Sequence, residues 1–502
     1  MKQLKKNMTV VCLSIACLGA TVSHANERYI VKFKEQRANE GRAILALEGL
    51  REIKALASDN AVVTKLDRRS LTRLKRVAAI EYIEPDAKRY PQSVGEITPY
   101  GINMVNAPAI SDSAAASRTV CIIDSGYRID HEDLPAGANV SASPDGGAGD
   151  PYSPLNSHGT HVAGTIAALS NGLGVLGVLP SDLINLHIVR VFNDVGNFVY
   201  ASDLVGALDE CVENGANIVN MSLGGPQFSI TESRAFRNVL RSNILSVAAA
   251  GNDGTRARSY PASYSSVISV AAIDSAKQHA AFSQQNRSVE LAAPGVAVRS
   301  TVVPGTGFDE RLAVDGIAYE AAALIGSASA TGSGPLVSCG IGDMPCPGGS
   351  GQVCLIERGQ VSFADKVNNC AAGGGVAAVI YNNSAGLFVG TLGGVATTIP
   401  AVSIAGDDAS TLLSSGIGET ANVTTLGGGD YAFFDGTSMA TPHVAGVAAL
   451  VWSHHLDCSA SEIRAALTET AEDIASPGKD RLTGYGLVNA SEAKIYLDNN
   501  GC

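Results

Sequence analysis

The sequence lacks any apolar run of the roughly 20 residues that a helix needs to cross a bilayer, so no membrane partner is expected. Its ten cysteines include no Cys-x2-Cys pair, which argues against the common zinc-binding motifs. Positive charge is scarce, with 36 Lys and Arg against 48 Asp and Glu, so no nucleic-acid partner is expected. What is present is a Gly-rich globular chain of 502 residues, long enough for about three domains.

The N-terminus has the three parts of a secretory signal. Lysines at positions 2, 5 and 6 precede an apolar run over residues 8–22, which is too short to span a bilayer. The small-x-small sequence Ser23-His24-Ala25 follows it. We therefore expect residues 1–25 to be a signal peptide and the protein to be secreted to the extracellular space.

Residues 27–90 differ from the rest in charge and pattern. Residues 27–89 carry a net charge of +5, whereas the chain after residue 89 carries −20. The periodicity predicts strands at 28–33, 62–66 and 80–86 and helices at 44–57 and 70–77. This segment is therefore expected to form a small α+β unit of its own, and one interpretation is a domain that binds a partner.

Three segments carry residues suited to nucleophilic catalysis. Residues 119–126 read as a buried strand that ends at Asp124, and residues 156–164 as a loop that enters a helix at His158. Ser438 lies in the first turn of a predicted helix of small residues, where Pro442 is also tolerated. A single serine in this position is usually a helix cap. A nucleophilic serine needs a base and the base needs a carboxylate, and the three segments supply that set in the order Asp, His, Ser.

These three motifs and their order resemble those of the subtilisin-like serine proteases (subtilases, peptidase family S8). The resemblance implies an endopeptidase that hydrolyses peptide bonds in proteins through an acyl-enzyme, with Ser438 as nucleophile, His158 as base and Asp124 as its orienting partner. It implies a subtilisin-like three-layer α/β/α catalytic domain with a parallel sheet, formed by residues 95–305 and 428–495. The alternation of apolar strands and helices independently predicts an α/β fold.

The same resemblance assigns residues around the substrate. Asn252 is expected to complete the oxyanion hole. Leu223, Gly224 and Gly225 are expected to pair with an extended substrate peptide, and Ala250 to help form the wall of a pocket for an apolar side chain. Protein or peptide substrates are therefore the expected partners, and we expect a monomer.

By the same resemblance, residues 27–90 are an inhibitory propeptide, a small α+β domain whose tail lies in the active-site cleft. The propeptide would act as an intramolecular inhibitor and be removed by autoprocessing of the preproenzyme. A basic propeptide would also dock favourably on an acidic enzyme. Cleavage is expected between residues 90 and 95.

A structural calcium site also follows from the resemblance. Its ligands would be side-chain oxygens of Glu96, Asp133 and Asn171 and the carbonyl oxygens of Leu169, Leu173 and Val175. Such hard oxygen donors are what Ca²⁺ prefers. Glu96 departs from the glutamine usual in the family, and a metal-free glycine loop is the alternative interpretation.

Residues 309–425 interrupt the catalytic pattern, and segments such as 353–359 and 371–383 resemble the β-rich protease-associated (PA) domain. Such a module is expected to govern substrate access or protein interaction without taking part in catalysis. Lys366 and Asp365 are expected on the solvated face of an amphipathic helix.

Eight cysteines remain after the predicted signal, an even number that favours disulfides in an exported chain. Four of them cluster at residues 339–370 and are expected to pair among themselves, in any of three connectivities. Cys458 is expected to pair with Cys502, which leaves Cys121 for Cys211.

Two other classes of protein fit parts of the sequence. A binding or adhesion protein on an inactive protease scaffold would be signalled by the loss of a triad residue, and none is lost. A serine esterase of the α/β-hydrolase type would need the order Ser, Asp, His, which is not the order found.

Overall fold

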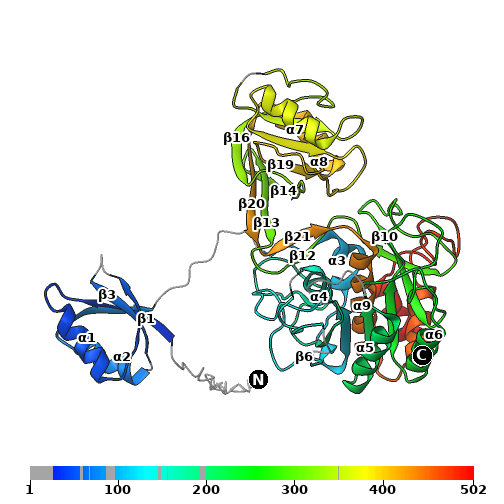
Figure 1. Cartoon of the computed structure of the whole chain (residues 1–502), viewed down its shortest axis with the longest axis horizontal. Coiled ribbons are helices and arrows are strands. Elements are labelled where there is room, and N and C mark those ends of the chain that lie inside the picture. The colour runs from blue at the N-terminus through cyan, green and yellow to red at the C-terminus, as the bar shows by residue number, and fades with distance from the viewer. Residues whose placement is uncertain are drawn as a thin grey trace, which may run out of the picture. The chain divides into compact units, whose positions relative to one another are not determined.

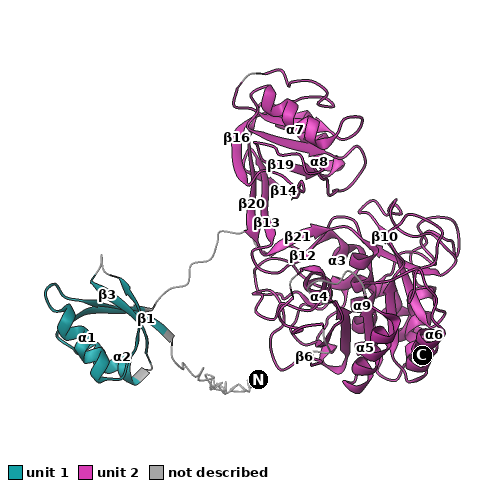
Figure 2. Cartoon of the chain, in the orientation of Figure 1, with its two compact units in different colours: residues 1–92 teal, residues 93–502 magenta. Residues whose placement is uncertain are grey.

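The computed structural model describes residues 27–56, 60–66, 68–85, 96–144, 148–154, 156–192, 199–348 and 350–502. The expected signal peptide (1–25), the end of the expected propeptide and the expected cleavage region (90–95) lie outside the described residues. The chain divides into two compact units, Met1–Gln92 and Ser93–Cys502 (Figure 1; teal and magenta in Figure 2). Within the described residues, no helix is both long and apolar enough to cross a membrane.

The first unit is a four-stranded antiparallel sheet, in the order β2-β3-β1-β4, with two helices. Helix α1 packs tightly on β1, since a Cβ on Gly41 would lie 2.2 Å from the ring of Phe33. The elements are β1 (Glu27–Phe33), α1 (Ala38–Leu47), β2 (Glu52–Leu56), β3 (Ala61–Leu66), α2 (Arg68–Leu74) and β4 (Ile80–Pro85).

One expectation for this unit is wrong. The helix predicted over residues 44–57 ends at Leu47, and residues 52–56 form strand β2 instead. Gly49 has φ +71°, a left-handed conformation that takes the chain out of the helix. Beyond it, β2 pairs antiparallel with β3, and this tertiary pairing overrides the helical periodicity.

The second unit is built on a seven-stranded parallel sheet in the order β11-β10-β9-β8-β5-β7-β6. Strands β8 to β11 are buried throughout, which explains their nearly continuous apolar sequences. The strands are β5 (Thr119–Asp124), β6 (Val140–Ala142), β7 (Asn185–Arg190), β8 (Ile218–Met221), β9 (Leu245–Ala249), β10 (Val267–Ile273) and β11 (Val289–Pro294).

Helices cover both faces of this sheet, which confirms the predicted three-layer α/β/α architecture. On β5, Val120 and Ile122 pack in a core with α4 and α9, whereas Cys121 and Ile123 pack in another with α5 and α6. Successive side chains of β5 therefore point to opposite faces of the sheet and pack in two separate cores. The helices are α3 (Tyr100–Met104), α4 (His158–Ala167), α5 (Ala201–Glu213), α6 (Ile230–Arg241), α9 (Thr437–His454), α10 (Ala460–Glu469) and α11 (Ala490–Asn500).

The expected PA insert forms a mixed eight-stranded sheet in the order β14-β13-β20-β16-β17-β18-β19-β15 (Figure 1). A two-stranded ribbon, β12 (Val298–Thr301) with β21 (Tyr431–Phe434), flanks it and leads directly into α9. The insert comprises β13 (Gly307–Val314), β14 (Ile317–Tyr319), β15 (Ala321–Ala323), β16 (Ala330–Ser338), β17 (Val353–Glu357), α7 (Phe363–Ala372), β18 (Ala377–Tyr381), β19 (Ala401–Ile404), α8 (Gly406–Thr411) and β20 (Thr420–Gly429).

The expectation that Lys366 lies on the solvated face of helix α7 is wrong. Asp365 is exposed as expected, but Lys366 is completely buried. Its ammonium donates hydrogen bonds to the carbonyl oxygens of Ile341 and Gly359 (2.9 Å to the latter). Burial lowers the pKa of Lys366, and these carbonyls replace the water that a surface lysine would have.

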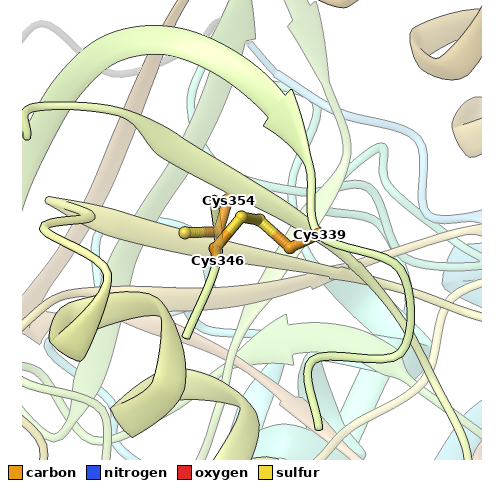
Figure 3. A group of neighbouring side chains, drawn as sticks. All are labelled: Cys339, Cys346 and Cys354. Carbon is orange, nitrogen blue, oxygen red and sulfur yellow. A yellow bond between two sulfur atoms is a disulfide. The ribbon is translucent and has the colours of Figure 1, made fainter. Parts of the chain in front are cut away.

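The expected disulfides are present. Cys121 pairs with Cys211 and Cys458 with Cys502. In the insert, where three connectivities were open, the pairs are Cys339–Cys346 and Cys354–Cys370. The sulfur atoms of residues 339, 346 and 354 gather closely (Figure 3), but all belong to disulfides and are therefore not free to bind zinc.

Candidate active site

Asp124 and His158 meet at the carboxyl end of the central strand. Strand β5 ends at Asp124 and α4 begins at His158, so the two chain positions converge where α/β sheets place their ligands. His158 Nδ1 lies 2.8 Å from Asp124 Oδ1. Asp124 is 1% exposed, whereas the His158 side chain is 34% exposed. A buried carboxylate thus orients an imidazole whose other edge is accessible to solvent.

The environment of His158 sets its basicity. Burial by itself lowers the pKa of His158, but the charge of Asp124 and its hydrogen bond outweigh this effect, so the pKa is raised above its ordinary value. The approach of α4 to β5 requires a glycine after the histidine, because a Cβ on Gly159 would lie 2.2 Å from the carbonyl oxygen of Gly126. Gly159 N also donates to Ser125 Oγ at 3.0 Å.

Ser438, the second residue of α9, is held by a reciprocal pair of hydrogen bonds. Its Oγ donates to the carbonyl oxygen of Ser222 at 3.0 Å, and Ser222 Oγ donates to the carbonyl oxygen of Ser438 at 2.7 Å. Ser438 Oγ is not hydrogen-bonded to His158 in this structure. Catalytic hydrogen bonds often form only when substrate is bound.

Pro442 explains why Ser222 is needed. It is the sixth residue of α9, beyond the first turn, so its missing N–H would otherwise have bonded to the carbonyl of Ser438. Ser222 Oγ bonds to that carbonyl instead. The expectation that Pro442 occupies the first turn is therefore wrong, and the sequence alone did not reveal the role of Ser222.

Asn252 lies beside Ser438 with a fixed orientation. Its Oδ1 accepts hydrogen bonds from the backbone N–H of Thr437 at 2.9 Å and from Thr437 Oγ1 at 2.8 Å. The amide nitrogen is thereby left to donate elsewhere. Asn252 and Ser438 line the same hollow of about 330 Å³. Thr437, which sequence analysis did not single out, orients the amide.

The expected substrate-pairing segment forms the border of two hollows. Leu223, Gly224 and Gly225 line the hollow with Ser438 and also a larger one, of about 680 Å³, that contains Asp124 and His158. The two hollows together form a cleft. All three expected catalytic residues line it, and residues 223–225 form the border between its two parts.

The structure differs from two of the expectations about substrate binding. Gly225 already pairs with Tyr260, through N–H···O distances of 2.9 and 2.8 Å. Ala250 packs in the hydrophobic core at 1% exposure, and its neighbour Ala249 lines the hollow. Polar residues line this hollow as well, namely Asp253, Arg258, Ser259 and Gln284.

The six expected calcium ligands also meet in space. Glu96 Oε1 accepts the backbone N–H groups of Asn171 and Gly172, both at 2.8 Å. The backbone N–H of Val175 donates a hydrogen bond to Asp133 Oδ2 at 2.9 Å. The backbone N–H of Leu169 donates one to the carbonyl oxygen of Asp133 at 3.1 Å.

The remaining contacts complete a single oxygen-rich loop. Leu173 N donates to Asn171 Oδ1 at 2.8 Å, and Asn171 Nδ2 lies 3.2 Å from Asp133 Oδ1. Asp133 is fully buried, and burial raises its pKa to about 8, with a smaller contribution from the charge of Glu96. Two carboxylates, an amide and three carbonyls with no cationic side chain among them fit a hard divalent cation.

A parallel α/β sheet that places an Asp, a His and a Ser around one cleft is typical of serine hydrolases. Comparison with protein families makes this specific: the subtilase family model matches residues 116–319 and 374–486, and the PA domain model matches residues 332–412. The chain therefore belongs to the subtilase family and is a serine endopeptidase with an inserted PA domain.

Individual relatives of this chain are also subtilisins or similar proteases. Subtilisin E of Bacillus subtilis (strain 168) is 36% identical over 310 residues, which cover 59% of this chain and 79% of the relative. An alkaline protease of Shouchella clausii is 34% identical over 319 residues, covering 60% and 81%. Among solved structures, the psychrophilic subtilisin-like protease Apa1 from the Antarctic psychrotroph Pseudoalteromonas sp. AS-11 matches with a TM-score of 0.75 and 43% identity, over 81% of this chain and 99% of that chain.

Proposed function

We propose that Asp124, His158 and Ser438 form the catalytic triad of this endopeptidase. The observation that carries the proposal is the 2.8 Å contact between His158 Nδ1 and the buried Asp124 carboxylate, at the mouth of a cleft that also contains Ser438. Asp124 holds the imidazole with its Nε2 toward the cleft. It also stabilises the imidazolium that forms during the reaction.

The reaction begins when Ser438 Oγ leaves the carbonyl of Ser222 and donates instead to His158 Nε2. As Oγ attacks the scissile carbonyl carbon, His158 takes the proton, and the C–O bond of a tetrahedral intermediate forms. His158 then returns the proton to the leaving amine as the C–N bond breaks. Water, activated by the same imidazole, hydrolyses the acyl-enzyme and regenerates Ser438.

The oxyanion of that intermediate would lie between Asn252 Nδ2 and the backbone N–H of Ser438. Asn252 is suited to this role because Thr437 engages its oxygen and so directs its nitrogen. The N-terminal end of α9 adds a favourable partial charge. Donors fixed before the reaction stabilise developing charge without reorganising.

Substrate would bind as an added strand beside Leu223 and Gly224. The backbone N–H and C=O groups of these two residues make no hydrogen bonds with other described residues, so they are available to an extended peptide. The carbonyl of Ser222 becomes a further acceptor when Ser438 turns toward His158.

We further propose that the protein is a secreted, autoprocessed preproenzyme. Supporting this are the signal-like N-terminus and a separate first unit that ends at Gln92, close to the expected cleavage region. The first unit would then be an intramolecular inhibitor, and its positive charge suits an acidic catalytic unit. We propose a monomer with protein substrates.

Calcium is proposed as a structural ion at Glu96, Asp133 and Asn171, with the carbonyls of Leu169, Leu173 and Val175. Bound there, it would supply positive charge to the buried carboxylate of Asp133 and the partly exposed one of Glu96, and fix the loop that follows α4. It would have no part in bond cleavage.

The decisive experiment compares the expressed protein with its Ser438→Ala variant. A fluorophosphonate probe should label only the parent, and only the parent should hydrolyse casein and acquire a new N-terminus at residues 91–96. A folded parent, free of residues 27–90, that takes no label would refute the triad and favour an inactive binding scaffold. Labelling without the new terminus would refute autoprocessing alone.

A further inference from the structure

A polar hollow of about 510 Å³ in the second unit contains none of the proposed catalytic residues, although it shares Arg258 with the hollow that Ser438 lines. Its lining includes the cations Arg258, Arg287, Arg464 and Lys479 and one carboxylate, Glu290. We call it the basic hollow. Such a concentration of positive charge is unexpected in a chain of net charge −12. A local excess of one sign at the surface attracts counter-ions of the other.

Arg464 and Glu290 form the fixed wall of the basic hollow. The guanidinium of Arg464 donates through Nε and Nη2 to the Glu290 carboxylate, and through Nη1 to the carbonyl of Ser265 at 3.0 Å. Their side chains are only 19% and 9% exposed. This pair is therefore electrically compensated and its donors are used.

The other three cations are not compensated. Arg258 and Arg287 are exposed, and neither makes a hydrogen bond or ion pair with a described residue. Lys479 lies 4.7 Å from the ring centre of Tyr485, a cation–π contact that leaves its charge in place. Three positive charges around one hollow repel one another unless an anion lies between them.

Hydroxyl groups add neutral donors to the same wall. Ser233, Ser263, Ser265 and Ser288 line the basic hollow, and none of their Oγ atoms is hydrogen-bonded to a described residue. Guanidinium groups bind the oxygens of phosphate bidentately, and hydroxyl and ammonium groups bind the remaining oxygens. The free donors thus match a compact, multiply charged oxyanion.

We propose that the basic hollow binds a phosphoryl group, with Arg258, Arg287 and Lys479 providing the charge and the serine hydroxyls the remaining hydrogen bonds. The hollow is larger than a free phosphate ion requires, so a phosphoryl group on a larger molecule can also enter. Inorganic phosphate and a phosphorylated side chain offer the same chemistry. The test separates them.

Titration calorimetry on the full-length Ser438→Ala protein provides that test, with inorganic phosphate and O-phosphoserine as separate ligands at constant ionic strength set by NaCl. We expect saturable binding that weakens about tenfold in Arg287→Gln and further in Arg258→Gln/Arg287→Gln, because each guanidinium contributes charge-assisted hydrogen bonds. Tighter binding of O-phosphoserine would assign the site to a phosphorylated side chain, and equal or tighter binding of phosphate to the free ion.

Arg256→Gln is the matched control, since Arg256 is an exposed arginine of the same segment that does not line the hollow. Its binding should equal that of the parent. No saturable binding of either ligand, or equal losses in Arg256→Gln and Arg287→Gln, would overturn the proposal. The readout is binding at a hollow that Ser438 does not line, so the outcome is independent of whether Ser438 is the nucleophile.

Discussion

The bond between Ser222 Oγ and the Ser438 carbonyl makes a sharp prediction about stability. Pro442 deprives that carbonyl of its helical partner, and Ser222 is the donor that replaces it at 2.7 Å. Ser222→Ala should therefore leave a carbonyl unpaired at the start of a buried helix. Leaving such a group unsatisfied costs about 1–3 kcal/mol.

Pro442→Ala restores the missing N–H and should compensate for the loss. In a double-mutant cycle, the loss caused by Ser222→Ala should shrink in the Pro442→Ala background, with a coupling of about 1 kcal/mol. The measurement is the apparent Tm at one scan rate, in a Ser438→Ala background that prevents autolysis and keeps the carbonyl of residue 438. A loss of this size corresponds to a decrease of a few degrees.

Ser453 provides the matched control in the same helix. Its Oγ donates to the carbonyl of Leu450 at 2.7 Å, but that carbonyl also has a helical N–H partner within reach. Ser453→Ala should therefore cost less than Ser222→Ala and be insensitive to Pro442→Ala. Equal losses at the two serines, or strict additivity of Ser222→Ala with Pro442→Ala, would refute the reasoning.

Three further predictions concern the proposed site. Activity should be lost on acidification through a limb above pH ~6.5, because the pKa of His158 is raised and catalysis needs its neutral form; Asp124→Asn should lower kcat about 10⁴-fold and move the limb to lower pH. A flat profile from about pH 8 to pH 5 would contradict this. Asn252→Ala should lower kcat about 10²–10³-fold with little change in KM, the size found for such donors in this family. Chelation of calcium should lower the apparent Tm of the parent and leave that of Asp133→Asn nearly unchanged, whereas equal shifts in both would place the ion elsewhere.

The sheet and the candidate triad residues could be predicted from the sequence, because both are marked by short segments that can be recognised without knowing their partners in space. The strands that precede Asp124 and Asn252 are mainly apolar and almost entirely buried, as a parallel sheet covered on both faces requires. Strand β2 could not be predicted in the same way. Residues 52–56 have a helical pattern, and only pairing with β3, after the turn at Gly49, makes them a strand.

Roles that depend on distant partners were also hidden. Ser222 acquires its role from Pro442 and Ser438, more than 200 positions along the chain, and nothing in the residues next to Ser222 indicates it. Thr437 lies within the serine motif, so its position could have suggested a role in orienting Asn252. That role became evident only when the two side chains were found to meet.

Lys366 shows the physical basis of this limit most clearly. Along α7 it occupies a position that amphipathic spacing can assign to solvent, yet it is fully buried. Burying an ammonium is unfavourable unless oxygens replace its water, and here the carbonyls of Ile341 and Gly359 do so. Both come from loops outside the helix, so no periodicity within α7 encodes them. The same reasoning applies to the basic hollow, whose cations are drawn from positions 258 to 479 and form no motif in the sequence.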